Sequence, residues 1–110
     1  MKRSQLIRQT RRLIAEGERL EVSPSLNGLR LWLKLSDELL SEAWGQMDRY
    51  HLAWLMVGRP EAARGRQMTA DEEADYIRSV AEQKTAALRM SLKAADEQHM
   101  PFVGETREGE

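Results

Sequence analysis

Two histidines are the side chains best suited to acid–base chemistry, and one of them stands one helical turn from a carboxylate. His51 follows Asp48 by three residues, so in a helix the Asp48 carboxylate could orient the His51 imidazole as a general base. The alternative interpretation is a half-buried histidine that is paired locally on a tryptophan-rich helix. His99 stands near the end of the last predicted helix and is expected to face solvent. Because the chain has no cysteine, two separated histidines provide no ligand set for zinc.

Pairs of carboxylates four residues apart are the second candidate for chemistry. Glu38 and Glu42 share one face of a predicted helix, as do Asp71 and Asp75, and such pairs can bind a divalent cation. A solvated helix face is the competing interpretation. The Glu-x-x-His pattern of di-iron bundles does not occur, nor does a phosphate loop, a nucleophile elbow or a dinucleotide fingerprint. We therefore expect a protein that is not an enzyme and needs no metal or cofactor.

The N-terminal segment is strongly basic. Residues 1–15 contain no acidic side chain and carry the basic residues Lys2, Arg3, Arg8, Arg11 and Arg12. Spacings of three and four place the last three on one patch of a helix, which could bind nucleic-acid phosphates or an acidic protein surface. Arg64 and Arg66 would add to such a patch. The alternative is internal pairing, of Arg12 with Glu16 and of the other basic residues with the acidic last helix.

Three tryptophans, Trp32, Trp44 and Trp54, fall on neighbouring predicted helices. Their spacing is typical of core anchors rather than of a ligand cage. If some of them stay exposed together with Leu31 and Leu35, they mark a protein interface instead. The candidate interaction patch therefore combines basic and apolar positions: Arg8, Arg11, Arg12, Leu31, Trp32, Leu35 and Trp54.

Hydrophobic periodicity predicts the helices that must position these side chains. The expected helices span about 4–21, 25–44, 46–57 and 69–98. Gly45 stands where a C-terminal cap of the second helix belongs, and Thr69 with Glu72 forms a capping box before the last. The sequence thus predicts an all-α protein, a small four-helix bundle in a single domain at 1–100, with a frayed tail at 101–110.

The predicted helices differ in the bulk of their apolar faces. The helix at 25–44 has a wide apolar arc, broadened by Leu31 and Leu35, which predicts a central helix covered on more than one side. The last helix has few large side chains on its inner face and is expected to cover the core without forming its centre. The short helix at 46–57 is apolar nearly all round, as expected of a segment packed between neighbours. A strand over Leu52–Val57 is the alternative there.

Composition limits the class of protein. The chain has 110 residues, of which 41% are hydrophobic and 32% charged, as expected of one small folded domain. Its formal charge of −1 creates no net field that attracts nucleic acid or an anionic membrane. The longest clearly apolar run without a charge is far shorter than the roughly 20 residues of a membrane span, and no signal-peptide core follows the basic start. We expect a cytoplasmic protein that does not act at a membrane.

Three segments carry a resemblance to a known kind of domain. The run Leu-Ile-Ala-Glu-Gly-Glu-Arg-Leu at 13–20, the triplet Leu-Trp-Leu at 31–33 and the run Leu-Leu-Ser-Glu-Ala-Trp-Gly at 39–45 are similar to small all-helical accessory domains that stand beside nucleotide-binding or TIR-type effector domains in bacteria. The likeness spans most of residues 13–95 and rests on aliphatic positions and one tryptophan. It implies a stand-alone helical partner subunit that acts in assembly or sensing. No effector domain is visible in this sequence, and no functional residue is carried over.

Together these patterns favour a non-catalytic interaction or assembly module that self-associates or docks on a larger protein. In a homodimer, the basic first helix of one copy would lie near the acidic last helix of the other. The alternative is an accessory subunit that binds nucleic acid through the basic N-terminal helix.

Overall fold

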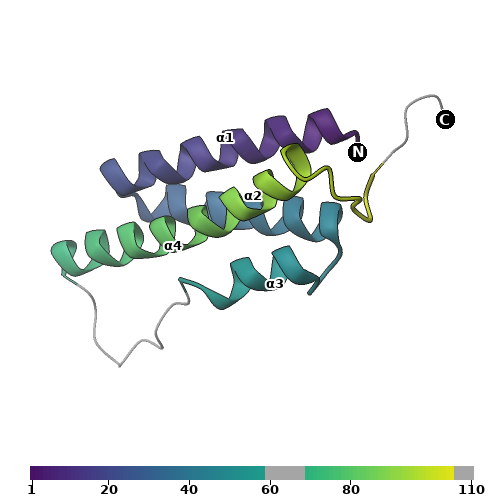
Figure 1. Cartoon of the computed structure of the whole chain (residues 1–110). Coiled ribbons are helices and arrows are strands. Elements are labelled where there is room, and N and C mark those ends of the chain that lie inside the picture. Colours follow the sequence, from purple (N-terminus) through teal and green to yellow (C-terminus); the bar gives the residue numbers. More distant parts are fainter. Residues whose placement is uncertain (59–68, 106–110) are drawn as a thin grey trace.

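The computed structural model describes residues 1–58 and 69–105, and within them every regular element is a helix. The helices are α1 (Arg3–Val22), α2 (Leu26–Trp44), α3 (Arg49–Met56) and α4 (Ala70–Asp96). They form an elongated bundle of 54 × 24 × 20 Å, in which α3 lies beneath α2 and α4 (Figure 1). The predicted all-α class is confirmed. None of the helices in the described segments is long and apolar enough to cross a membrane.

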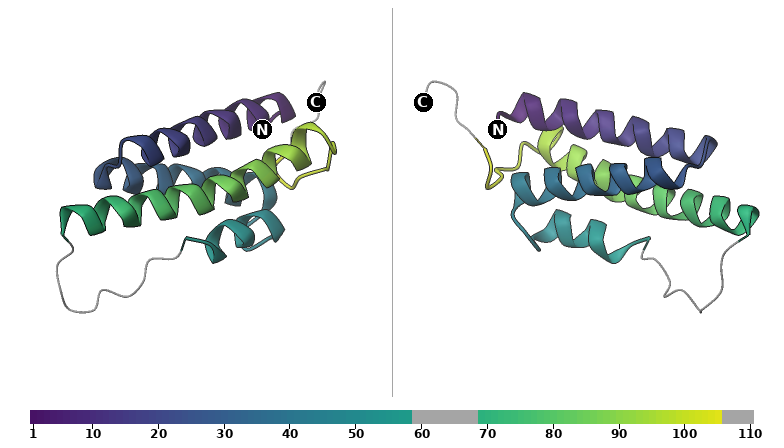
Figure 2. Two further views of the ribbon diagram at one scale, coloured as in Figure 1. Left: turned by 60° about the vertical axis from the view of Figure 1, so that its left-hand side comes forward. Right: turned by 180° about the vertical axis from the view of Figure 1, so that it is seen from behind.

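The long helices α1 and α4 lie side by side over most of their length and share the most extensive interface of the bundle (Figure 2). A close approach is possible because small residues occupy the contact. A Cβ atom added at Gly17 would stand 2.1 Å from Thr85 Oγ1. Ala81, Thr85 and Ala95 of α4 are fully buried. The prediction that the last helix only covers the core is wrong: α4 contacts all three other helices, and its small side chains bring α1 close.

The tryptophans anchor the core, as their spacing predicted. Trp32, Trp44 and Trp54 are only 3%, 2% and 4% exposed. The Trp32 indole N–H donates to the Leu13 carbonyl oxygen of α1 at 2.8 Å, and the Trp44 indole N–H donates to Ser91 Oγ of α4 at 2.8 Å. Each of these two indoles therefore ties α2 to a different neighbouring helix.

Helix α3 begins three residues later than its predicted start at 46, because a turn follows α2. The turn uses positive φ at Gly45 (100°) and Met47 (64°), and the Asp48 N–H donates to the Gly45 carbonyl oxygen. Only one face of α3 packs on the bundle, so the exposed side chains of Leu52 and Met56 contradict the expected packing on all sides. The segment 52–56 is helical, which excludes the strand alternative.

The chain beyond α4 folds back onto the bundle instead of fraying at residue 101. Phe102 is buried and meets the Trp44 ring edge-on, with 5.7 Å between ring centroids. The Gly104 N–H donates to the Ala43 carbonyl oxygen at 2.9 Å, and Arg3 of α1 pairs with Glu105. The predicted tail boundary is therefore too early. The rest of that predicted tail, residues 106–110, lies outside the described residues.

Candidate functional site

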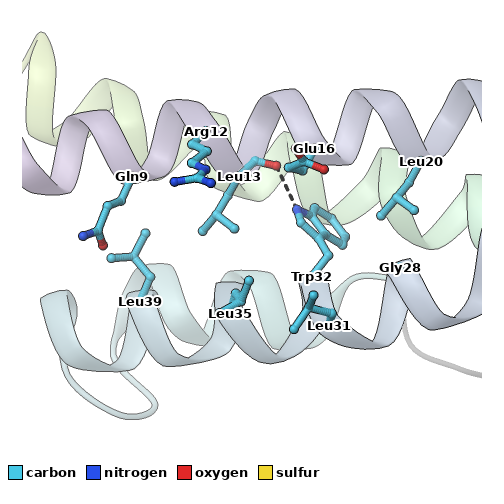
Figure 3. A pocket seen from close by; sticks show the side chains of 10 residues that line it. All are labelled: Gln9, Arg12, Leu13, Glu16, Leu20, Gly28, Leu31, Trp32, Leu35 and Leu39. Atoms are coloured by element: carbon cyan, nitrogen blue, oxygen red, sulfur yellow. Dashed lines mark hydrogen bonds between the residues drawn. The ribbon is translucent and has the colours of Figure 1, made fainter.

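A groove of about 490 Å³ runs between α1 and α2 (Figure 3). Its floor is apolar and buried, formed by Leu13 and Leu20 of α1 and by Trp32 and Leu39 of α2. Its edges are of two kinds. The α1 edge is polar, and the α2 edge carries leucines. The edge residues are Gln9, Arg12 and Glu16 on α1, with Gly28, Leu31 and Leu35 on α2.

The leucines of the α2 edge are the large apolar side chains that the bundle leaves uncovered beside this groove. Leu31 is 59% exposed and Leu35 is 45% exposed. Helix α2 is covered on more than one side, as expected, but its buried arc does not extend to Leu31 and Leu35. The reason is that α1 and α4 cover one flank of α2 and α3 covers another, which leaves the Leu31 and Leu35 flank to solvent. Adjacent exposed leucines at the edge of an apolar groove are typical of a protein-binding surface.

The structure brings together only part of the predicted interaction patch. Arg12, Leu31, Trp32 and Leu35 all line the groove, with the Trp32 ring in its floor. Trp54 lies elsewhere, buried in α3, where the Lys84 ammonium stands 3.9 Å from its ring centroid. Sequence reasoning missed Gln9 and Glu16 of the α1 edge, because a polar residue on a helix looks the same whether or not an apolar groove lies beside it.

Some of the basic N-terminal side chains are engaged in contacts within the molecule. Arg3 donates to the Ala95 carbonyl oxygen at 2.9 Å and pairs with Glu105, and Arg11 pairs with Asp96 of α4 at 2.8 Å. The Arg11–Asp96 pair agrees with the expected pairing with the last helix, whereas the acidic partner of Arg3 lies beyond that helix.

The remaining basic positions differ from the predicted pairing. Arg12 does not pair with Glu16, whose carboxylate lies 3.6 Å from Arg19. Arg8 and Arg12 are exposed and form no ion pair with another residue of the described segments. Arg64 and Arg66 lie outside the described residues.

His51 is buried and both of its ring nitrogens are engaged. Its Nε2 stands 2.5 Å from Asp37 Oδ1 of α2, and its Nδ1 accepts the Met47 backbone N–H at 2.9 Å. Because Nδ1 accepts a hydrogen bond, the proton of the neutral ring sits on Nε2 and is donated to Asp37. The partner is therefore Asp37, across the α2–α3 contact, and not Asp48. His99 is exposed, as predicted.

This arrangement suits a structural role better than general-base chemistry. A general base needs a nitrogen lone pair within reach of a substrate proton, and the His51 lone pair is occupied by a backbone N–H. A polar hollow beside the ring is lined by Asp37, Ser41, Glu42, Gln46 and His51. Within residues 1–58 and 69–105, no group of three or more histidine, aspartate or glutamate side chains is placed to hold a metal ion.

In its described residues the molecule is a small all-α bundle with an apolar groove, edged by leucines, between α1 and α2. Comparison of the chain with protein-family models, with curated proteins and with solved structures finds no match. The resemblance to bacterial helical accessory domains stays a prediction.

Proposed function

We propose that this chain is a non-catalytic protein-interaction module that binds another protein chain along the α1–α2 groove. The observation that carries this proposal is the pair of exposed leucines, Leu31 and Leu35, beside a buried apolar floor. Complete burial of an exposed leucine is worth about 1.5–3 kcal/mol, so covering these two half-exposed side chains contributes about 2 kcal/mol to association. The partner is a larger protein or a second copy, and a cytoplasmic location belongs to the same proposal.

The state of the groove supports binding of a protein segment. Its floor residues are held in place, since the Trp32 indole is hydrogen-bonded to α1 and Leu13 and Leu20 are buried. Because the apolar groove is already formed, binding of a partner requires little rearrangement, and little of the binding free energy is lost to it. The polar α1 edge, with Arg12 and Glu16, offers both charge signs to an incoming chain.

The test is capture of binding proteins by the tagged chain from its native lysate, with nuclease present. The wild-type chain should retain a defined protein, either another protein or the untagged chain, and Leu35→Glu should lose it. Met90→Glu is the matched control, because Met90 is a similarly exposed apolar residue (56%) on α4 and does not line the groove. Equal retention by both variants would contradict the proposed surface.

Nucleic-acid binding is the second candidate, supported by the exposed Arg8 and Arg12 without ion pairs. Binding to phosphates releases counterions, so affinity for duplex DNA or RNA should fall steeply between 50 and 200 mM salt. Arg8→Glu combined with Arg12→Glu should abolish that binding. Absent binding at low salt, or binding that salt does not weaken, would exclude this candidate.

A further inference from the structure

The outer flank of α2 carries charges that the described chain leaves without ion pairs. They follow at four-residue intervals, two cations and then two anions: Arg30, Lys34, Glu38 and Glu42. All of them are exposed. Residues four apart lie on the same side of a helix, so they form one continuous row, here called the α2 charge row. None of these side chains forms an ion pair with another residue of the described segments.

The order of the charges opposes the dipole of α2. The N-terminal end of a helix carries partial positive charge and favours anions, and the C-terminal end favours cations. Helix α2 has no acidic residue in its first turn and no basic residue in its last turn. Its cations stand in the N-terminal half of the row and its anions in the C-terminal half. The row therefore does not stabilise an isolated α2, which points to complementary charges on a partner.

The exposed leucines accompany this row. Leu31 follows Arg30 and Leu35 follows Lys34 in the sequence, so each leucine stands one position from a member of the row. Both leucines also line the groove (Figure 3). An apolar strip flanked by charged residues is the usual composition of an interface between helices.

We propose that two copies of this chain associate through α2, antiparallel about a two-fold axis at the level of Ser36. In this arrangement Arg30 of each copy stands opposite Glu42 of the other, and Lys34 stands opposite Glu38. Every charge of the row then faces its opposite, whereas parallel copies would bring like charges together. Leu35 lies next to the axis and packs against its counterpart, and Leu31 lies one turn away. This inference rests on the proposed interaction function and names its partner.

The self-complementarity of the row is what selects a second copy as the partner. A two-fold interface uses the same patch on both subunits, so the patch must carry its own complement. The α2 charge row does so at two independent positions, and antiparallel α2 helices also bring the opposite ends of their dipoles together.

The test is sedimentation equilibrium of the full chain, with single charge reversals and their combinations. The wild-type chain should be in a monomer–dimer equilibrium. Lys34→Glu and Glu38→Lys each place like charges opposite one another, so each should raise the dimer dissociation constant by about tenfold or more. An equimolar mixture of the two variants should dimerise like the wild type, because each supplies the charges that the other lacks. The double variant Lys34→Glu/Glu38→Lys should dimerise as well.

Two further variants complete the design. Leu35→Glu should leave the chain monomeric, because it brings the new carboxylates of the two copies together at the two-fold axis. Arg49→Glu, a reversal of an exposed charge at the start of α3, should leave the dissociation constant unchanged. Circular dichroism spectra that match the wild type establish that each variant is folded.

The outcomes separate this inference from the proposed function. A wild-type chain that stays monomeric, or a dimer that the reversals do not weaken and the mixture does not restore, overturns the antiparallel α2 dimer. In either case the capture experiment still tests the proposed function. If the wild-type chain captures a different protein and the Leu35→Glu variant does not, the groove is supported as a binding surface. Weakening by both single reversals with recovery in the mixture supports the inference.

Discussion

At the scale of single residues, one glycine allows three helices of the bundle to approach one another closely. Gly17 of α1 lies against Thr85 of α4 and the Trp32 ring of α2, so it stands where three helices meet. A glycine in a helix interior costs about 1 kcal/mol relative to alanine. The geometry shows what offsets that cost: without a Cβ atom at position 17, α1 approaches both α4 and the Trp32 indole closely.

Gly17→Ala should therefore destabilise the protein although it improves helix propensity. Its Cβ atom would lie 2.1 Å from Thr85 Oγ1 and 2.8 Å from Trp32 Cζ2, and overpacking of this kind costs about 1–3 kcal/mol. Urea unfolding followed by tryptophan fluorescence measures the effect. Gly17→Ala/Thr85→Ala should recover part of the loss, since it removes the closest atom, a hydroxyl that is buried without a hydrogen-bond partner. Full additivity of the two single changes would contradict this explanation.

At the scale of elements, α3 is the least embedded helix, and a few polar contacts hold it. His51 joins it to Asp37 of α2, and Lys84 of α4 donates to the Trp54 carbonyl oxygen at 2.7 Å. His51 also ties the preceding turn through the Met47 N–H. The attachment of α3 thus depends on a few buried or partly buried hydrogen bonds in addition to the Trp54 ring.

His51→Ala should loosen α3 before it affects the rest of the bundle. It leaves the Met47 N–H without its acceptor and removes the contact to Asp37, which we expect to cost about 1–3 kcal/mol. Hydrogen exchange should show lost protection in α3 with retained protection in α1 and α4. His99→Ala, at an exposed histidine, serves as the control and should change neither quantity. Uniform loss of protection in all four helices would argue against a local role.

The segment after α4 is held against the bundle by the buried Phe102 ring, together with the Gly104 backbone hydrogen bond and the Arg3–Glu105 ion pair. Phe102→Ala removes the buried ring that packs on Trp44 and should lower the free energy of unfolding by about 3 kcal/mol. Val103→Ala, next to it but 81% exposed, should stay within about 0.5 kcal/mol of the wild type. Chemical denaturation of both variants makes the comparison, and equal stability would mean that the segment does not pack as the structure has it.

At the scale of the whole molecule, the bundle is elongated and leaves one long flank of α2 to solvent. Association through that flank would couple stability to concentration, because anything that binds only the folded state stabilises it by mass action. The melting temperature of the wild-type chain should rise as its concentration is raised a hundredfold. The Leu35→Glu variant should melt at a temperature that does not depend on concentration. Differential scanning calorimetry measures both, and a concentration-independent wild type would speak against self-association.

The sequence by itself determined the helices and most of their ends. Hydrophobic periodicity, the Gly45 cap and the Thr69–Glu72 capping box are local signals, and they placed α1, α2 and α4 to within two residues. Local signals also identified the tryptophans as core anchors, because their spacing sets them on the inner faces of their helices. Periodicity shows which side of a helix is apolar, and one or two turns of sequence are enough to show it.

Only the tertiary structure decided which apolar faces are covered and which polar groups meet. Leu31 and Leu35 belong to the same wide arc as Trp32, and nothing local separates them, yet packing buries Trp32 and leaves the leucines exposed. His51 pairs with Asp37 rather than Asp48 because α3 packs against α2 after the turn with positive φ at Met47. Which helix faces are covered and which distant side chains pair depends on how helices far apart in sequence pack against one another. The spacing of residues within one helix carries no information about that packing.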